Sequence, residues 1–399
     1  MRIAFVSSAV PRRCGIATFT SDLTAGVRTA DPTVSVRSVA IDEPFAARTY
    51  GADIGWRITQ GDPASYAAAG RAISASSVDV VNLQHEFGLY GVWHDGLYDD
   101  HLAVFLDACT KPVVTTFHTV PPQPEMWARA TIRNATDQSA AVVVMSATGA
   151  RLLRELYGVS KSPHVIEHGM PVIDPHGRRR LKRELAMEGR SVISTFGLVD
   201  PRKGLEYVVQ ALPEIVSRHP SALYLVIGQT HPELLRHQGE TYRNSLIDVA
   251  LQMGVSDQLR FVNEYLTQSE IVDYLLASDV YVTPYLDPGQ ITSGTLAYAL
   301  GAGKAIVSTP YLHASEVLGA GRGLLVPFRD PPAIASAVVR ILQDPALKGS
   351  LERGAYAYGR KTTWPAVGTD VLSLMRRVTA PLEDFPVADE LAPEPVLIA

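Results

Sequence analysis

The sequence predicts an α/β fold with two domains, each built around a parallel β-sheet. Short apolar runs of the fully buried type recur along the chain, and loops and helix-like segments follow them. This series occurs twice, once on each side of a polar, basic stretch at 174–183. At 399 residues the chain is also longer than a single core usually grows, so we expect two domains.

The composition is that of an ordinary globular protein, with 46% hydrophobic and 19% charged residues. The net charge of −5 gives no reason to expect nucleic acid as a partner. Cys14 and Cys109 are the only cysteines, which are too few for a disulfide framework or a zinc site and fit a reducing compartment. The sequence contains no signal peptide and no apolar segment of spanning length. We therefore expect a cytoplasmic protein and leave contact with a membrane surface open.

The first half of the chain, residues 1–174, contains five apolar runs that we predict as strands: 3–7, 34–40, 79–84, 112–117 and 141–145. Gly15 stands in the loop after the first run, before a helix predicted from about Phe19. His85 and Glu86 follow the third run, and His118 follows the fourth. Because the carboxyl ends of parallel strands meet at one edge, where ligands of open α/β sheets bind, we expect these polar side chains to form a site.

The stretch 174–183 is predicted to be a linker that runs into a helix. It carries five basic side chains, which we interpret as a solvated helix face, with contact to acidic lipid or an acidic acceptor as the alternative. The second half contains six predicted strands: 192–196, 223–227, 259–263, 280–284, 305–308 and 323–327. Helices are predicted at 205–218, 268–277 and 332–343, with a last one from about 365 to 378. The Pro-rich, acidic tail at 380–399 is predicted to be disordered.

Two loops of the second half favour an anionic ligand. Residues 287–295 are small and polar and lead from a strand into an Ala/Leu helix, so backbone N–H groups and the helix dipole can bind an anion there. An ordinary turn with a Ser/Thr cap is the alternative. Arg202 and Lys203 stand where a loop meets the start of a helix. Positive charge is unfavourable at the N-terminal end of a helix dipole. An anionic ligand bound there would explain the two basic residues.

The order of elements and a set of motifs resemble the retaining glycosyltransferases of the GT-B fold, in the large family four that uses nucleotide sugars. The motifs lie at 196–197 with 203–204, 225–228, 278–284, 299–304 and 316 with 323–326. The resemblance covers residues 1 to about 378. It implies two Rossmann-like domains that face each other across a cleft. Residues 1–174 would form the acceptor side and 175–364 the nucleotide-sugar side, and a helix at 365–379 would cross back onto the first domain.

The resemblance also implies roles for matched residues. Lys203 matches a lysine that binds the donor diphosphate, and Arg202 is expected to replace a family arginine whose position holds Leu198. His118 matches a histidine that faces the donor sugar. The expected catalytic residues are Lys203, Arg202, His118 and Gln290. The expected donor-binding residues are Gly15, Tyr265, Leu266, Thr292, Ser293, Gly294, Thr295, Tyr298 and Glu316. His85 and Glu86 are the candidates for the acceptor side.

One departure from the family pattern is large. In the family, two glutamates separated by seven residues contact the transferred sugar and the ribose. The matching positions here hold Gln290 and Tyr298, and neither is acidic. Gln290 can still bond sugar hydroxyls as donor and acceptor, but it carries no charge. We interpret the pair as a variation within a subgroup, because Lys203, His118 and the glycine loops are intact.

The implied function is transfer of a mannosyl or glucosyl unit from a GDP- or UDP-linked sugar to a hydroxyl acceptor, a saccharide or a glycolipid. No metal and no cofactor is expected, and the sequence does not specify the oligomeric state. A nucleotide-sugar epimerase or hydrolase is one alternative. A non-catalytic protein that binds sugar nucleotides is another, supported by the missing acidic pair. A Rossmann dehydrogenase is disfavoured, because no Gly-x-Gly-x-x-Gly with a downstream acidic residue occurs.

Overall fold

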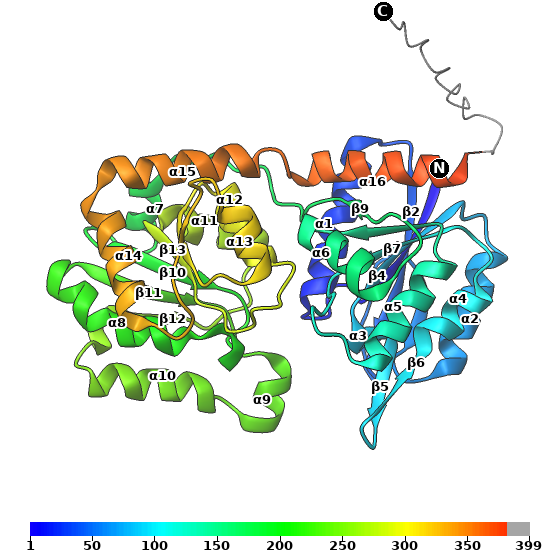
Figure 1. Ribbon diagram of the computed structural model, residues 1–399, viewed down its shortest axis with the longest axis horizontal. Coiled ribbons are helices and arrows are strands. Elements are labelled where there is room, and N and C mark those ends of the chain that lie inside the picture. The colour runs from blue at the N-terminus through cyan, green and yellow to red at the C-terminus, as the bar shows by residue number, and fades with distance from the viewer. Residues whose placement is uncertain (381–399) are drawn as a thin grey trace, which may run out of the picture.

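The computed structural model describes residues 1–380, which form two α/β domains that lie side by side (Figure 1). The N-terminal sheet has seven strands in the order β3-β2-β1-β4-β7-β8-β9. They are β1 Arg2–Ser7, β2 Ser35–Asp42, β3 Ile54–Thr59, β4 Val80–His85, β7 Val113–Phe117, β8 Ala141–Val144 and β9 His164–Val165. A two-stranded antiparallel hairpin, β5 Gly91–His94 and β6 Leu97–Asp100, extends from this domain.

The C-terminal sheet has six strands in the order β12-β11-β10-β13-β14-β15. They are β10 Ser191–Phe196, β11 Ala222–Ile227, β12 Leu259–Val262, β13 Val280–Thr283, β14 Ala305–Ser308 and β15 Leu324–Leu325. Every pair of neighbours in both large sheets is parallel. The predicted α/β fold with two parallel-sheet domains is therefore confirmed.

Helices pack around both sheets. Those of the N-terminal domain are α1 Gly15–Ala30, α2 Pro63–Ser74, α3 Phe87–Tyr90, α4 His101–Ala108, α5 Met126–Gln138 and α6 Ala147–Leu152, which continues as a π-helical turn Leu153–Tyr157. Those of the C-terminal domain are α7 Arg178–Glu184, α8 Leu205–Arg218, α9 Pro232–Gln238, α10 Thr241–Gln252, α11 Gln268–Ala277, α12 Gly294–Gly301, α13 Leu312–Leu318, α14 Pro331–Gln343 and α15 Pro345–Gly359. A short 3-10 helix, Pro201–Lys203, precedes α8.

The central strands form because their sequences are apolar on both faces. All six residues of β4 and all six of β11 are buried, as a sheet covered by helices on both sides requires. The edge strand β3 and the hairpin were not predicted. Strand β3 has only one buried residue, Ile58, and contains Gly55, so it lacks the apolar run by which the buried strands are recognised.

The last helix, α16 Trp364–Thr379, returns to the N-terminal domain and packs along α1 (Figure 1). Gly26 and Gly368 allow the two helices to approach closely. A Cβ atom at Gly26 would lie 2.3 Å from the carbonyl oxygen of Trp364, and one at Gly368 would lie 2.4 Å from the carbonyl carbon of Gly26. The helix thus joins the end of the described chain to the domain in which the chain began.

The chain crosses between the domains twice, and the two crossings are hydrogen-bonded to each other. The backbone N–H of Met170 donates to the carbonyl oxygen of Thr362 at 3.0 Å, and that of Trp364 donates to the carbonyl oxygen of Met170 at 2.8 Å. Met170 and Thr363 form a parallel bridge. The two connections therefore act as one narrow, paired segment.

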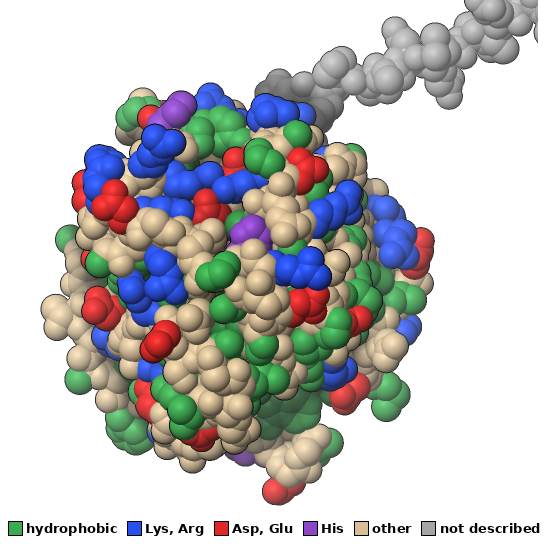
Figure 2. All heavy atoms as spheres, turned by 90° about the vertical axis from the view of Figure 1, so that its left-hand side faces the viewer, with side chains coloured by type: hydrophobic (Ala, Val, Ile, Leu, Met, Phe, Trp, Pro, Cys, Tyr) green, Lys and Arg blue, Asp and Glu red, His purple; other side chains and the backbone are tan. Residues whose placement is uncertain are grey.

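The basic stretch before the second domain forms α7, and carboxylates pair with its cations. Arg178 contacts Glu352 at 2.6 Å, and Lys182 contacts the buried Asp279 at 2.5 Å. Figure 2 shows acidic side chains among the basic ones at this end of the molecule. Among residues 1–380, no helix combines the length and the apolar character needed to cross a bilayer. The tail predicted at 380–399 lies, from residue 381 onward, outside the described residues.

Candidate active site

A cavity of about 560 Å³ lies between the two domains, at the carboxyl ends of strands from both sheets. Its N-terminal wall comes from the loop after β1 and from α1, and its C-terminal wall from the loops after β10, β11 and β12 and from α12. The volume lies within the range of about 300–1,000 Å³ that small-molecule sites occupy. Ligands of open α/β sheets bind at this edge, and here two such edges face each other.

One face of α1 lines the N-terminal wall. Gly15, Thr18, Phe19 and Asp22 all contact the cavity, at the spacing i, i+3, i+4, i+7 of a single helix face. The N-cap residue Cys14 gives this 16-residue helix no side-chain cap, so among residues 1–380 no N-cap side chain accepts from its first-turn N–H groups. A Cβ atom at Gly15 would meet no atom within 4 Å. The start of α1 therefore presents open backbone to the cavity.

Lys203 lines the C-terminal wall with its charge uncompensated. Its Nζ atom lies 3.8 Å from the centroid of the Tyr285 ring, a cation–π arrangement that leaves the ammonium group free to bind an anion. Within residues 1–380, no carboxylate lies within the 4.0 Å limit of an ion pair with this group. Tyr285 in turn stacks on Tyr311 at 5.5 Å, so the aromatic support under the lysine is fixed.

Arg202 also lines the cavity, but Asp200 already holds it. The guanidinium donates from Nε at 3.0 Å and from Nη2 at 2.8 Å to the two oxygens of this carboxylate. Burial alone would raise the pKa of Asp200, but hydrogen bonds from Arg202 outweigh it and hold the pKa below its usual value. The Arg202 side chain is 77% exposed, so the pair lies at the cavity rim with little net charge.

Glycines let the backbone of the C-terminal wall approach the cavity. Gly204 adopts φ +63°, and a Cβ atom there would lie 2.3 Å from the carbonyl oxygen of Pro284. At the start of α12, a Cβ atom at Gly294 would lie 2.8 Å from Nε2 of His168. Gly294 and Thr295 both line the cavity. The N-terminus of α12 thus faces the N-terminus of α1 across the same space.

Tyr298 belongs to a polar cluster that joins the two domains. Its hydroxyl donates to Oδ2 of Asp22 at 3.0 Å and accepts from Nε2 of Gln268 at 2.9 Å. Gln268 Nε2 also donates to Asp22 at 3.0 Å. Burial raises the pKa of the Asp22 carboxyl by more than these two hydrogen bonds lower it. A carboxylate therefore lies beside the position at which the family pattern has a glutamate, but it comes from the opposite domain.

The loop after β12 forms the outer end of the cavity. Tyr265 and Leu266 both line it, and contact of this region with the base stays a prediction. The Tyr265 hydroxyl lies 3.4 Å from Oγ1 of Thr18, and its ring lies 5.4 Å from the guanidinium carbon of Arg13. An aromatic and an aliphatic side chain here offer a flat apolar surface next to the polar cluster.

The predicted sugar contact His118 does not line this cavity. The ring of Phe19, which does, packs edge-on against it at 4.7 Å. The Nε2 atom of His118 lies 2.8 Å from Oε1 of Gln84. Burial, together with the neighbouring His168 and His85, lowers the pKa of His118 to about 3. The imidazole is therefore a neutral hydrogen-bonding group behind the wall.

The two predicted acceptor residues need correction. His85 is fully buried, stacks on Tyr90 at 5.7 Å, and has no hydrogen-bond partner for either ring nitrogen among the described residues. Burial lowers its pKa to about 3, so it is a neutral member of the aromatic core. Glu86 caps α3 and accepts from Oγ1 of Thr119 at 2.7 Å. Burial raises its pKa despite these bonds. Neither residue lines the cavity.

Glu316 also needs correction as a donor contact. Its two carboxylate oxygens accept the backbone N–H groups of Ala147 at 2.8 Å and Thr148 at 2.9 Å, at the start of α6 in the opposite domain. A carboxylate at a helix N-terminus is favourable, because it satisfies free donors and complements the dipole. Glu316 therefore connects the two domains away from the cavity.

Three residues of the loop before α12 are directed into the protein. The backbone N–H of Ser293, predicted to face an anion, donates instead to Nδ1 of the buried His313 at 3.1 Å. Gln290 Nε2 donates to the carbonyl oxygen of Thr292 at 2.7 Å. The Thr292 hydroxyl is buried without a partner in the described chain. None of the three lines the cavity, so the open part of this turn begins at Gly294.

The structure thus divides the predicted site residues into two groups. Eight line one cavity: Gly15, Arg202, Lys203, Tyr265, Leu266, Gly294, Thr295 and Tyr298. Seven do not: His85, Glu86, His118, Gln290, Thr292, Ser293 and Glu316. Asp22, His168 and Gln268 line the cavity without having been predicted. The spacing of Asp22 from Gly15 would have indicated it, had the helix been predicted to start at Gly15 rather than near Phe19.

Family models match both halves of the chain. The model of Glycosyltransferase Family 4 matches residues 14–172, and that of Glycosyl transferases group 1 matches residues 190–344. Among curated relatives, the phosphatidyl-myo-inositol mannosyltransferase of Mycolicibacterium smegmatis is 27% identical over 193 residues, or 48% of this chain and 46% of the relative. The D-inositol 3-phosphate glycosyltransferase of Acidothermus cellulolyticus is 28% identical over 254 residues, or 58% of this chain and 52% of that relative. The matched part spans about half the length of these relatives.

Solved structures resemble the whole described chain. HepE of Anabaena, in complex with UDP and glucose, has a TM-score of 0.73 at 15% identity, with 94% of this chain and 100% of that chain covered. Sucrose-phosphate synthase of Thermosynechococcus elongatus has a TM-score of 0.75 at 17% identity, with 95% of this chain and 99% of that chain covered. At this identity the likeness shows the fold. The chain therefore has the GT-B fold, and its first and second halves match the models of Glycosyltransferase Family 4 and of Glycosyl transferases group 1, respectively.

Proposed function

We propose that this chain is a retaining glycosyltransferase. It moves a mannosyl or glucosyl unit from a UDP- or GDP-linked sugar to the hydroxyl of a saccharide or glycolipid acceptor, and it uses no metal ion. The observation that carries the proposal is the uncompensated Lys203 in a cavity that both helix N-termini, α1 and α12, also face. The names of the relatives, a mannosyltransferase and a glycosyltransferase, agree with this activity.

The cavity walls suit a leaving diphosphate. Negative charge grows on the diphosphate as the sugar departs, and an enzyme lowers this barrier by fixed positive groups placed in advance. Lys203 supplies a full charge, and Gly15 and Gly294 place backbone N–H groups and helix dipoles on opposite sides of the same space. Arg202 contributes less, because Asp200 already neutralises it. Lys203 is therefore the main electrostatic group of the proposed site.

The cluster of Asp22, Gln268 and Tyr298 suits a ribose. A carboxylate that accepts from sugar hydroxyls is the role that the family pattern gives to a glutamate at the position of Tyr298. In this chain Tyr298 instead donates to Asp22, and the carboxylate comes from α1 of the opposite domain. We assign the ribose contact to Asp22, with Gln268 beside it. The missing acidic pair is then partly replaced from across the cleft, and closure of the domains would complete the donor site.

In the proposed transfer step, one bond at the sugar C1 breaks and one forms. The bond between the sugar C1 and the diphosphate oxygen breaks, and its electron pair stays on the diphosphate beside Lys203. The acceptor hydroxyl forms the new bond to C1 on the face that the diphosphate leaves, so the configuration is retained. A phosphate oxygen takes the proton of that hydroxyl. The neutral His118, held by Gln84 behind Phe19, keeps the adjoining wall rigid.

The test is a panel of nucleotide sugars, with thermal stabilisation and release of nucleoside diphosphate as readouts. A ligand at 100 times its dissociation constant should stabilise the protein by about 2.7 kcal/mol. Release should need an acceptor, and Lys203→Ala should reduce it by roughly 10²–10³-fold, the loss expected for one electrostatic group at a transition state. Lys361→Ala removes an exposed lysine and is the matched control.

Each other result has a distinct meaning. Release that needs no acceptor would favour an epimerase or hydrolase. Binding of a nucleotide sugar with no release of nucleoside diphosphate, whatever acceptor is added, would favour a non-catalytic binding protein. The non-acidic side chains of Gln290 and Tyr298 would then explain the lack of turnover. If no nucleotide sugar stabilises the protein, the proposed function is wrong.

A further inference from the structure

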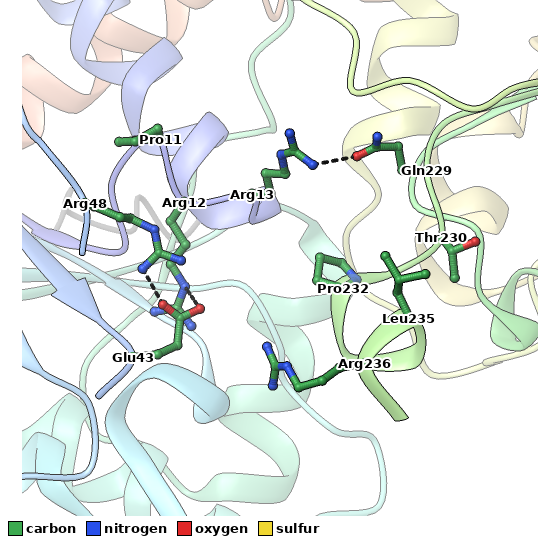
Figure 3. Close-up of a pocket in the computed structure, with 10 residues that line it drawn as sticks. All are labelled: Pro11, Arg12, Arg13, Glu43, Arg48, Gln229, Thr230, Pro232, Leu235 and Arg236. Atoms are coloured by element: carbon green, nitrogen blue, oxygen red, sulfur yellow. Dashed lines mark hydrogen bonds and ion pairs between the residues drawn. The ribbon is translucent and has the colours of Figure 1, made fainter. Parts of the chain in front are cut away.

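A second pocket, rich in arginine, lies between the domains beside the donor cavity (Figure 3). It measures about 430 Å³, and of the described residues only Gln229 lines both spaces. The N-terminal domain contributes the loops after β1 and β2, and the C-terminal domain contributes the loop after β11 and α9. Its charged residues are Arg12, Arg13, Arg48, Arg236 and Glu43. We name it the arginine pocket.

Carboxylates do not balance the arginines of this pocket. Glu43 contacts both Arg12 at 3.1 Å and Arg48 at 2.5 Å, so one negative charge is shared by two cations. Asp42, behind the wall, is likewise shared between Arg48 at 2.9 Å and Arg57 at 2.8 Å. Glu233 pairs with Arg236 at 2.9 Å. Arg13 donates to the neutral Gln229 at 2.9 Å and lies over the Tyr265 ring, and no carboxylate of residues 1–380 pairs with it, so the pocket has an excess of positive charge.

The arginines also keep unused donors. A guanidinium carries five N–H groups on three nitrogens. Arg48 and Arg236 bond their carboxylates through Nη1 alone, and Arg13 bonds Gln229 through Nη1. In the described chain, the Nε and Nη2 atoms of these three residues have no hydrogen-bond acceptor. Figure 3 shows Arg48 and Arg236 on opposite sides of the open space, one from each domain.

The remaining walls of the arginine pocket are apolar. Pro11, Pro232 and the half-exposed Leu235 line it among the charged groups. A ligand with an anionic group and a small carbon skeleton would use both surfaces. A phosphate monoester fits, because its oxygens accept the paired N–H groups of guanidinium in a bidentate manner.

We propose that the arginine pocket is the acceptor subsite and that the acceptor carries a phosphate group. This inference rests on the proposed function, since it takes the neighbouring cavity to be the donor site. Arg48 and Arg236 bind the phosphate from opposite domains, and the acceptor's sugar or polyol ring extends past Gln229 toward the donor. The phosphate belongs either to a soluble sugar or polyol ester or to the headgroup of a phospholipid, and the experiment separates these sources.

The test uses calorimetry on the full chain with glucose 6-phosphate and with glucose. We expect the phosphate ester to bind at least about tenfold more tightly, the size of a charge-assisted contact. Arg48→Gln and Arg236→Gln should each weaken that binding about tenfold and leave the affinity for UDP or GDP unchanged. Arg180→Gln is the matched control, because Arg180 is 59% exposed and pairs with Glu184, much as Arg236 is 60% exposed and pairs with Glu233.

A second arm measures co-sedimentation with phosphatidylcholine vesicles, with and without phosphatidylinositol. Binding of the ester that needs both arginines assigns the pocket to a soluble phosphate. Binding of phosphatidylinositol vesicles alone, again dependent on both arginines, assigns it to a lipid headgroup. The inference is overturned if neither probe binds better than its neutral counterpart, or if both variants bind like the parent. Arg236→Gln changes an exposed side chain, so it tests the pocket even if Arg48→Gln fails to fold.

The outcomes also separate this inference from the proposed function. If UDP or GDP sugars bind and the phosphate probes do not, only the acceptor inference falls. If the phosphate probes need the arginines but no nucleotide sugar binds, the proposed function and the acceptor role fall together, and the pocket remains a phosphate site of another kind.

Discussion

The two walls of the interdomain cavity differ in how they present their polar groups. The C-terminal wall exposes Lys203, Gly294 and Thr295 to the cavity, and from the sequence we expect these three residues to contact the donor. The polar residues predicted on the N-terminal side, His85 and Glu86, are bonded or buried within their own domain. Both sets follow the ends of parallel strands, so position at a strand end does not by itself make a residue part of a site.

The difference follows from the loops after the strands. In the C-terminal domain, glycines at 197, 204 and 228 have positive φ angles and carry the backbone outward before a helix begins. In the N-terminal domain, His85 ends β4 and is fully buried, and Glu86 at once caps α3 and bonds Thr119, so neither residue reaches the cavity. The N-terminal wall instead uses one face of α1. A site can thus be built from loop backbone on one side and from helix side chains on the other.

The largest effect on this comparison should come from Gly204→Ala. The substitution forces a side chain into φ +63° and places Cβ 2.3 Å from the carbonyl oxygen of Pro284, so we expect a loss of about 3 kcal/mol in the free energy of unfolding. Gly15→Ala on the opposite wall should leave this free energy unchanged, because nothing lies within 4 Å, and should weaken nucleotide binding. Denaturant unfolding measures both. Equal stability of the two variants would contradict the distinction between the walls.

A smaller effect is expected for Asp22→Asn on the α1 face. The amide keeps the shape of the side chain but loses the charge that accepts from a ribose hydroxyl, so affinity for UDP or GDP should fall about tenfold. The sharper readout is discrimination. The parent should prefer UDP or GDP over its 2′-deoxy analogue, and the variant should lose that preference.

Asp137→Asn, at an exposed position, is the control for this comparison. If the Asp22 variant still discriminates against the deoxy nucleotide, then the ribose is bound elsewhere and the N-terminal wall contributes only packing.

The smallest effect at neutral pH should come from His85→Phe. Burial lowers the pKa of His85 to about 3, whereas an unfolded histidine titrates near 6.5. The unfolded state therefore binds the proton first, and stability is lost as the pH falls from about 6.5 to 3, at about 1.4 kcal/mol per pH unit for one proton. The variant should equal the parent at pH 7 and lose less stability at pH 5. Parallel stability curves for the two proteins would show that His85 is not buried as described.

Much of the fold could be predicted because the central strands are apolar on both faces. The runs at β1, β4, β7, β10, β11 and β13 were all predicted within a residue or two of their observed bounds. The edge strand β3 and the β5–β6 hairpin could not be, since Gly55 and the largely exposed residues of the hairpin give no buried run. Edges of sheets are specified by pairing with a neighbour, which a local pattern does not contain.

The site could be predicted where backbone conformation creates it, and not where side chains bond across the cleft. Lys203, Gly294 and Thr295 were found because a loop, a glycine and a helix start are visible in sequence. The bonds of Glu316 to α6 and of Tyr298 to Asp22 join residues 168 and 276 positions apart, and only the packing of the two domains against each other brings them together. Pairings at such separation leave no periodic trace along the chain.

The hydrogen-bonded double crossing at Met170 and Thr363 also sets how the molecule can open. Because both connections pass through one hydrogen-bonded segment, we expect the domains to rotate relative to each other about an axis near it. Displacement under rotation grows with distance from the axis. Helix α9, which carries Arg236, lies at the opposite edge of the molecule from this segment (Figure 1), so a small rotation would displace the two sides of the arginine pocket by more than the residues near the axis. An acceptor that binds Arg48 and Arg236 together would then hold the two domains together at a point far from the rotation axis.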